Sequence, residues 1–151
     1  MNLKIKRFNE LSTRELYEIL KLRAEIFVVE QNCPYNDLDD KDYECIHIFL
    51  EEENQILSYI RVLKPGVSYS DSSLGRVLVS KIARGKGLAK KIVQIGINYI
   101  FNELNEKAIT IGAQNYLKNF YETFGFESIS EVYLEDNIPH VDMTLKKRID
   151  K

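Results

Sequence analysis

Hydrophobic and polar residues follow one another along this chain in patterns that distinguish strands from helices. Leu3 and Ile5 alternate with lysines, which predicts a strand at the N-terminus. Residues 12–15 read Ser-Thr-Arg-Glu, a capping-box sequence in which Ser12 caps a helix and Glu15 reaches back to it. We therefore predict an amphipathic helix from Thr13 to about Val28. Its buried row has helical spacing: Leu16, Ile19, Leu20, Arg23, Ile26 and Phe27.

The middle of the chain predicts a hairpin and then a strand–helix–strand unit. Residues 46–50 and 56–63 are apolar runs separated by a polar turn at 51–54. A strand at 74–80, a helix at 85–101 and a nearly all-apolar strand at 108–113 follow. Such a unit forms a parallel crossover, which we expect to be right-handed.

The last third of the chain predicts one helix and a second hairpin. The helix spans 115–124, with Asn115 able to cap it and Gly125 suited to its C-terminal turn. Strands at 126–134 and 141–145 flank a turn at 136–139. The order is β-α-β-β-β-α-β-α-β-β, so we expect an α/β (α+β) fold. One mixed, mostly antiparallel central sheet would contain the parallel crossover and carry helices on both faces.

Length and composition restrict the class of protein. The 151 residues fit a single domain over 1–151 with an ordinary globular core. A net charge of −2 argues against a dedicated nucleic-acid-binding protein. No continuous apolar stretch resembles a signal peptide or spans a membrane. Cys33 and Cys45 do not make a disulfide framework, so we expect a cytoplasmic protein with reduced thiols.

Two glycines one residue apart stand in residues 83–93, ARGKGLAKKIV. A P-loop requires G-x-x-x-x-G-K-[ST], which Ala89 and Lys90 do not match. The dinucleotide fingerprint G-x-G-x-x-G fails because Lys90 replaces its third glycine, and no acidic residue ends the next strand. The pattern R-x-x-G-x-A/G fits, through Arg84, Gly87 and Ala89.

A helix N-terminus offers unpaired N–H groups, and glycines let that backbone approach a pyrophosphate closely. Arg84 and the neighbouring lysines add positive charge. The helix behind the loop would hold it through a buried face of Leu88, Ile92, Ile95 and Tyr99. Spacing alone leaves an ordinary helix start with solvent-facing lysines equally open.

Four stretches resemble known proteins. LGRVLVSKIARGKGLAKKIV is similar to the acetyl-CoA-binding motif of the GNAT superfamily of N-acetyltransferases, and AITIGAQNYLKNFYETFGF resembles their next motif. LRAEIFVVEQNCPYNDLDDKD and YLEDNIPHVDM resemble the start and end of the ElaA-like and YjcF-like branch. The resemblance is essentially full-length. Asn137 and Ala89 stand where glycines are common.

The resemblance implies a GNAT fold and transfer of acetyl from acetyl-CoA to an amine by direct attack, without a metal. It assigns the backbone of Val77, Leu78 and Val79 to the pantetheine arm, with an N–H of Leu78 or Val79 stabilising the oxyanion. It assigns the pyrophosphate to Arg84, Gly85, Lys86, Gly87, Leu88 and Ala89. Asn115 could bond the cofactor, and its neighbour Gln114 could face either the cofactor or the acceptor cleft.

The resemblance assigns the general acid to Tyr121, which would protonate the departing thiolate. Spacing also fits a half-buried core aromatic at Tyr121, and Asn115 could do no more than cap its helix. Residues 77–79 equally resemble an ordinary core strand.

The resemblance implies a small-molecule or peptide amine as the acceptor, and this amine would have to lose a proton. Candidate acceptor-side residues are Glu30, His47, Glu135 and His140, with water as the alternative base. His47 lies on an apolar strand, which favours a hydrogen-bonded core histidine. A run of aspartates could attract a cationic acceptor, although a solvated loop is the commoner outcome. These are Asp37, Asp39, Asp40 and Asp42.

Other chemistries fit the sequence poorly. Cys45 and His47 lack the paired C-x-x-C of structural zinc, and two residues apart on a strand they lie about 7 Å apart, too far for a nucleophile–base pair. Two rival functions are a non-catalytic acyl-CoA-binding module or sensor on this fold and a nucleotide-binding domain of another type. The sequence leaves open the acceptor's identity and whether the protein is a homodimer.

Overall fold

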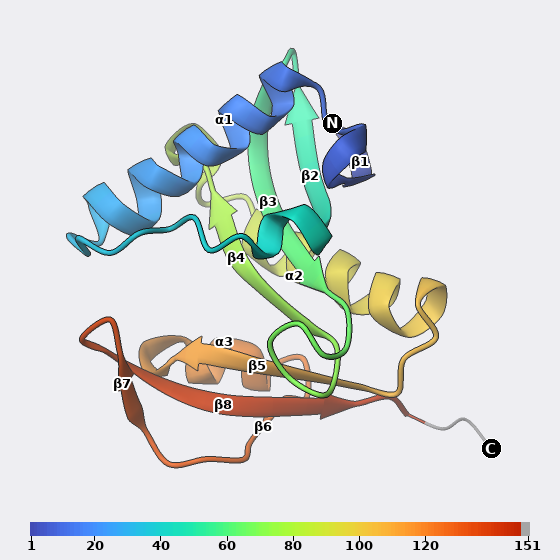
Figure 1. The fold of residues 1–151 in the computed structure, drawn as a ribbon, viewed down its shortest axis with the longest axis vertical. Coiled ribbons are helices and arrows are strands. Elements are labelled where there is room, and N and C mark those ends of the chain that lie inside the picture. Colours follow the sequence, from blue (N-terminus) through green and yellow to red (C-terminus); the bar gives the residue numbers. More distant parts are fainter. Residues whose placement is uncertain (149–151) are drawn as a thin grey trace.

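A computed structural model describes residues 1–148, so residues 149–151 of the predicted domain lie outside the described part (Figure 1). The predicted order of elements is present, with the strand predicted at 126–134 divided in two. The elements are β1 (Asn2–Arg7), α1 (Thr13–Arg23), β2 (Ile46–Glu52), β3 (Gln55–Leu63), β4 (Ser73–Val79), α2 (Leu88–Asn98), β5 (Ala108–Gln114), α3 (Lys118–Glu122), β6 (Glu127–Ser128), β7 (Tyr133–Glu135) and β8 (Ile138–Lys146).

The strands form two four-stranded halves. β1, β2, β3 and β4 are antiparallel neighbours in that order, while β8 lies between β5 and β6 and also pairs with β7. The halves meet at one parallel bridge between Ser72 and Ile109, where Thr110 N donates to Ser72 O at 2.9 Å. The single mixed sheet of the prediction is therefore divided, because β4 and β5 diverge after that bridge (Figure 1).

Helices cover both faces of the first sheet, as predicted. On β2, Ile46, Ile48 and Leu50 face one way and pack with α2, whereas Phe49 faces the other way and packs with Ile19 of α1. Alternate residues of a strand point to opposite faces, so helices on both faces leave β2 and β3 buried along almost their whole length. The second sheet shares the core under α2 through β5 and β8.

The local signals in the sequence account for most helix ends and turns. Ser12 Oγ accepts from Glu15 N at 3.0 Å, and Ser12 N donates to Glu15 Oε1 at 2.8 Å, so the predicted capping box is present. α1 continues as a π-helical segment over Ala24–Glu30. Two-residue turns with positive φ join β2 to β3 at Glu53–Asn54 and β7 to β8 at Asp136–Asn137.

Two helix starts differ from the prediction. α2 begins at Leu88, three residues later than predicted, because Gly85 and Gly87 adopt left-handed φ values of 82° and 74°. Residues 115–117 form a 3₁₀ turn before α3, and no side chain caps either element, so Asn115 does not act as the predicted cap. Gly125, with φ of 103°, follows the turn that ends α3.

Candidate functional site

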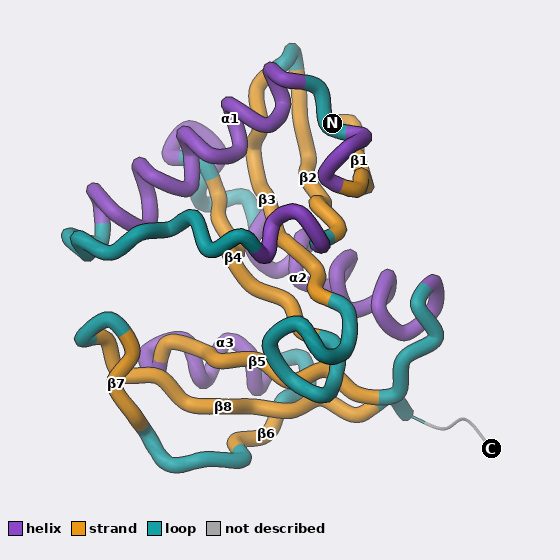
Figure 2. Tube along the Cα trace, viewed as in Figure 1, coloured by secondary structure: helices purple, strands orange, loops and turns teal. Residues whose placement is uncertain are grey.

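Where β4 and β5 diverge, a cleft of about 750 Å³ opens between the two sheets. Its walls come from β4, β5, the end of the α1 extension, the following loop, the start of α3 and the β7–β8 hairpin. In Figure 2 the loop that follows the α1 extension crosses above the second sheet, on the side where the two sheets are apart. The cleft therefore lies at the place where backbone groups of two strands are not paired with each other.

A β-bulge interrupts β4 beside the cleft. Tyr59 lies opposite Leu78 and Arg61 lies opposite Gly75, so Arg76 and Val77 together face the single residue Ile60. The backbone of Arg76 has a φ of 50°, a left-handed conformation that is rare for any residue other than glycine. The bulge redirects Val77, Leu78 and Val79, all of which line the cleft.

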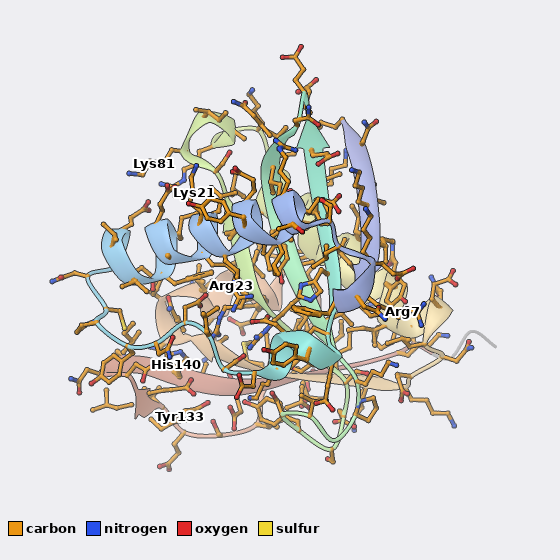
Figure 3. All side chains as sticks on the ribbon, turned by 45° about the horizontal axis from the view of Figure 1, so that its top comes forward. Arg7, Lys21, Arg23, Lys81, Tyr133 and His140 are labelled. Carbon is orange, nitrogen blue, oxygen red and sulfur yellow. The ribbon has the colours of Figure 1, made fainter. Side chains whose placement is uncertain are left out.

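Three arginines and three aspartates form an ion-pair network on the side of the cleft where the bulge lies. Buried Arg23 donates through Nε to Asp37 at 2.8 Å and through Nη1 to Asp42 at 2.7 Å. Figure 3 shows Arg23 between α1 and the sheets. Arg61 of β3 donates from Nη1 and Nη2 to Asp39 at 2.8 and 2.5 Å.

The bulge residue belongs to this network. Arg76 Nε lies 2.7 Å from Asp37 Oδ1, and Arg76 Nη2 donates to Asp37 O at 3.1 Å. Burial raises the pKa of Asp39, but the hydrogen bond and charge of Arg61 outweigh it and lower that pKa to about 2. Of the acidic run expected as a solvated loop, Asp37, Asp39 and Asp42 are instead neutralised by arginines, and only Asp40 is exposed.

The glycine loop lies directly after β4. A Cβ added at Gly85 or Gly87 would have no protein atom within 4 Å, so nothing in the protein fills the space above either residue. Their left-handed φ values and this open space are what a backbone needs for close approach to a phosphate group. Leu88 anchors the start of α2 in the core, Ala89 is half-buried, and Lys86 is exposed.

Arg84 and Glu30 form a two-pronged ion pair. Arg84 Nη1 and Nη2 each lie 3.0 Å from one oxygen of Glu30, and both residues line the cleft. The hydrogen bond from Arg84 lowers the pKa of Glu30. Glu30 is therefore a paired carboxylate in this structure, which makes it a poor base for an amine.

Tyr121 of α3 lies on the wall of the cleft. It is 7% exposed and packs edge-on against Phe120 and Phe126, with ring centroids 5.2 and 5.8 Å away. Burial raises the pKa of its phenol to about 12, so the hydroxyl stays protonated at neutral pH. It is a core aromatic whose edge also reaches the cleft, so the core alternative describes its packing, while its role as general acid stays a prediction.

The other predicted residues divide between the cleft and the core. Gln114 lines the cleft and donates from Nε2 to Gln31 Oε1 at 3.2 Å, whereas Asn115 is outside it. Glu135 and His140 line the cleft on the β7–β8 hairpin, with His140 Nε2 3.5 Å from Glu135 Oε2.

His47 does not reach the cleft. It is 1% exposed, its Nε2 donates to Asp42 O at 3.0 Å, and its Nδ1 accepts from Tyr59 Oη at 2.7 Å. Burial lowers its pKa, which keeps the ring neutral. The core alternative therefore describes His47, and His47 is not an acceptor-side residue.

Sequence reasoning overlooked Arg61 and Arg76. Both interrupt apolar strands, and a charged residue inside such a strand must find a partner when buried. Three arginines in apolar rows and a run of aspartates were the signal for the network. Tyr69 and Asp142 were also overlooked. Tyr133 donates to Asp142 at 2.5 Å within one hairpin, but Tyr69, which donates to the same carboxylate at 3.0 Å, lies 73 residues away in the sequence.

Within residues 1–148, both cysteines are free, no group of three His, Cys, Asp or Glu side chains has the geometry of a metal site, and no helix is long and apolar enough to cross a membrane.

Comparison with known proteins gives a consistent picture. Residues 15–147 match the family described as an acetyltransferase (GNAT) domain. ElaA of Escherichia coli K12 is 39% identical over 137 residues, covering 89% of this chain and 90% of that protein. A UPF0039 protein of Synechocystis is 38% identical over 141 residues, with coverage of 93% and 92%. The crystal structure of an acyl-CoA N-acyltransferase from Pseudomonas aeruginosa superposes with a TM-score of 0.89 at 34% identity, covering 95% of this chain and 99% of that one.

Proposed function

Because this chain belongs to the GNAT acetyltransferase family, we propose that it transfers an acetyl group from acetyl-CoA to an amine in a ternary complex. The observation that carries the proposal is the divergence of β4 and β5 after a single bridge, which leaves strand backbone free along a 750 Å³ cleft. The Pseudomonas relative, described as an acyl-CoA N-acyltransferase, supports the same reaction class.

The free edge of β4 suits the pantetheine arm. β3 occupies one edge of β4, and past the bridge the other edge faces the cleft, so Val77, Leu78 and Val79 can pair with an extended ligand as a neighbouring strand would. Ser80 N donates to Leu57 O of β3 at 2.9 Å, and alternate residues of a strand share an edge, so the N–H of Leu78 also points to β3. Of the two predicted donors, the N–H of Val79 therefore faces the cleft, and it would donate to the thioester oxygen as charge develops there. One such donor typically lowers the barrier by about 3 kcal/mol.

The glycine loop suits the pyrophosphate. Residues 84–89 place two left-handed glycines before the N-terminus of α2, whose first N–H groups have no partner within the helix. The positive end of the helix and the nearby Arg84 and Lys86 favour an anion there. Gln114 lies at the end of β5, on the opposite wall of the cleft, and would contact the cofactor from that side.

Tyr121 would act as the general acid. Its phenol holds its proton at neutral pH and lines the cleft, so it can donate that proton to the departing thiolate. The residues present can thus bind acetyl-CoA, stabilise the oxyanion and assist the leaving group with side chains and backbone alone.

Calorimetric titration with acetyl-CoA and an assay of free thiol release in the presence of amines would test the proposal. We expect saturable binding at one site, without competition by NAD or ATP, and thiol release that depends on an added amine. Binding without turnover across a broad amine panel would favour a non-catalytic acyl-CoA-binding module. Absence of binding by the folded protein would contradict the proposal as a whole.

A further inference from the structure

The proposed reaction also needs a base, and no residue has yet been assigned to that role. An amine is an ammonium ion at neutral pH and must lose a proton before it attacks. Among the acceptor-side candidates, Glu30 is paired with Arg84 and His47 is enclosed in the core. The remaining pair, Glu135 and His140, lies on the β7–β8 hairpin at the cleft. In Figure 3, His140 lies on the second sheet with Tyr133 close by.

Hydrogen bonding fixes the tautomer of His140. Its Nδ1 lies 2.7 Å from the carbonyl oxygen of Ile138. A carbonyl oxygen only accepts hydrogen bonds, so Nδ1 carries the proton and the neutral ring has its lone pair on Nε2. The side chain is 10% exposed and lines the cleft. This arrangement leaves Nε2 free to take a proton.

The ring is held by its neighbours on the sheet. His140 pairs with Tyr133 on β7, and their rings stack at 25° with centroids 6.1 Å apart. Tyr133 Oη and Tyr69 Oη both donate to Asp142 Oδ1, at 2.5 and 3.0 Å. Opposite Asp142 stands Gly112, where a Cβ would come within 2.8 Å of Tyr69 Oη. A side chain at that position would disrupt the support of Tyr133.

One carboxylate and two uncharged side chains surround the ring of His140. Glu135 Oε2 is 3.5 Å from Nε2, and this carboxylate would stabilise an imidazolium. On the other neighbouring strand, the residue paired with His140 is Gln114, which is uncharged and bonded to Gln31. Tyr133 keeps its proton because burial and its hydrogen bond to Asp142 raise its pKa.

We propose that His140 is the general base that deprotonates the acceptor ammonium, with Glu135 stabilising the imidazolium; the proposal rests on the proposed acetyl transfer. The lone pair of Nε2 takes one ammonium proton, and the neutral amine then forms its bond to the thioester carbon. When the carbon–sulfur bond breaks, the thiolate takes the proton of Tyr121, and the second amine proton restores the phenol. Imidazolium passes its proton to water, so one proton is released per turnover.

Two probe nucleophiles separate this role from a structural one. 1,4-Diaminobutane is protonated at neutral pH and needs a base, whereas hydroxylamine is uncharged and does not. In His140→Gln we expect kcat/KM for 1,4-diaminobutane to fall about 10²-fold and to recover as pH rises, with hydroxylamine within about threefold of the unmodified protein. Affinity for acetyl-CoA, measured by calorimetry, should be unchanged.

A second variant keeps the test independent of folding. Glu135 is 60% exposed on its side chain, so Glu135→Gln should fold normally and show a smaller loss confined to 1,4-diaminobutane. Equal losses with both nucleophiles, or no loss in His140→Gln, would overturn the base assignment. So would turnover of hydroxylamine alone by the unmodified protein. Failure to bind acetyl-CoA would instead overturn the proposed function.

Discussion

Glu30 and Arg84 stand 54 residues apart in the sequence, yet the guanidinium holds both carboxylate oxygens at 3.0 Å beside the cleft. The pair joins the end of the α1 extension to the glycine loop. A guanidinium engaged in this way has fewer donors left for a phosphate, and the carboxylate places a negative charge near the proposed anion site.

Glu30→Gln should therefore tighten binding of acetyl-CoA. We expect Kd to fall about two- to tenfold, because the variant removes a competing anion and releases Arg84. Calorimetry at low and high salt would measure the effect, which should shrink as salt screens the charges. Glu25→Gln removes an exposed charge from the same segment and should leave Kd unchanged. Weaker binding in Glu30→Gln would show that the pair positions Arg84 for the phosphate instead.

Tyr121→Phe should lower kcat with little effect on binding. The substitution removes only the hydroxyl, for which the described residues provide no hydrogen-bond partner, so the melting temperature should change by less than about 2 °C. We expect a decrease in kcat of about 10²-fold or more, with Kd for acetyl-CoA within about twofold. Tyr17→Phe, at an exposed tyrosine of α1, is the matched control. Parallel losses of binding and rate would mean that Tyr121 shapes the cleft rather than donating a proton.

Gly87→Ala and Gly66→Ala separate backbone strain from ligand approach. Both glycines have positive φ, 74° and 90°, and neither added Cβ would meet a protein atom within 4 Å. Each variant should therefore lose about 1–2 kcal/mol of unfolding free energy from the left-handed conformation alone. Only Gly87→Ala should raise Kd for acetyl-CoA, by more than about tenfold. Similar affinities in both variants would contradict the role of the loop as a pyrophosphate cradle.

Arg23→Met should destabilise the fold strongly. The substitution leaves Asp37 and Asp42 without the buried cation that both of them bind. Removing one partner of a buried ion pair costs about 3–5 kcal/mol, which urea unfolding would measure. Lys21→Met removes an exposed cation of the same helix and should change the unfolding free energy by less than about 0.5 kcal/mol. A loss below about 1 kcal/mol in Arg23→Met would show that the network contributes little net stability.

The free energy of unfolding should decrease in acid because of Glu15, near the start of α1. Burial raises the pKa of this carboxyl, but hydrogen bonds from Lys6, from Ser12 N and from Lys4 outweigh it and lower the pKa from 4.5 to about 2. A folded-state pKa below the unfolded one contributes stability above pH 4.5, and that contribution is lost as pH falls toward 2.

Glu15→Gln should therefore be destabilised at pH 7, with the difference from the unmodified protein shrinking between pH 4.5 and 2. Urea unfolding across that range measures it, and Glu18→Gln on the next turn of α1 provides the comparison. A difference that is constant with pH would attribute the effect of Glu15 to helix capping alone.

Features that depend on neighbouring residues were predictable from the sequence. The capping box at Ser12 and Glu15, the hairpin turns and the apolar rows need only nearby positions, and each is present. The family resemblance assigned Tyr121 and Val77–Val79 to one site, which spacing could not have done, and these residues line the same cleft.

Features set by distant contacts were not predictable in the same way. The aspartates at 37, 39 and 42 resemble a solvated loop until Arg23, Arg61 and Arg76 are brought to them by three different elements. Likewise, Gly75 inside β4 is only a weak sign of the bulge, because the residue with positive φ is Arg76, an arginine that is unfavourable there locally and is stabilised by Asp37.

The lone bridge between Ser72 and Ile109 also has a consequence for folding. The strands of the first sheet come from residues 2–79 and those of the second from residues 108–146, so each sheet is contiguous in sequence. Short sequence separations favour rapid pairing within each part, and the two parts then associate through the apolar side chains beneath α2. Fragments divided at Asn105, which occupies a left-handed turn between them, should consequently recognise each other and reassemble when mixed.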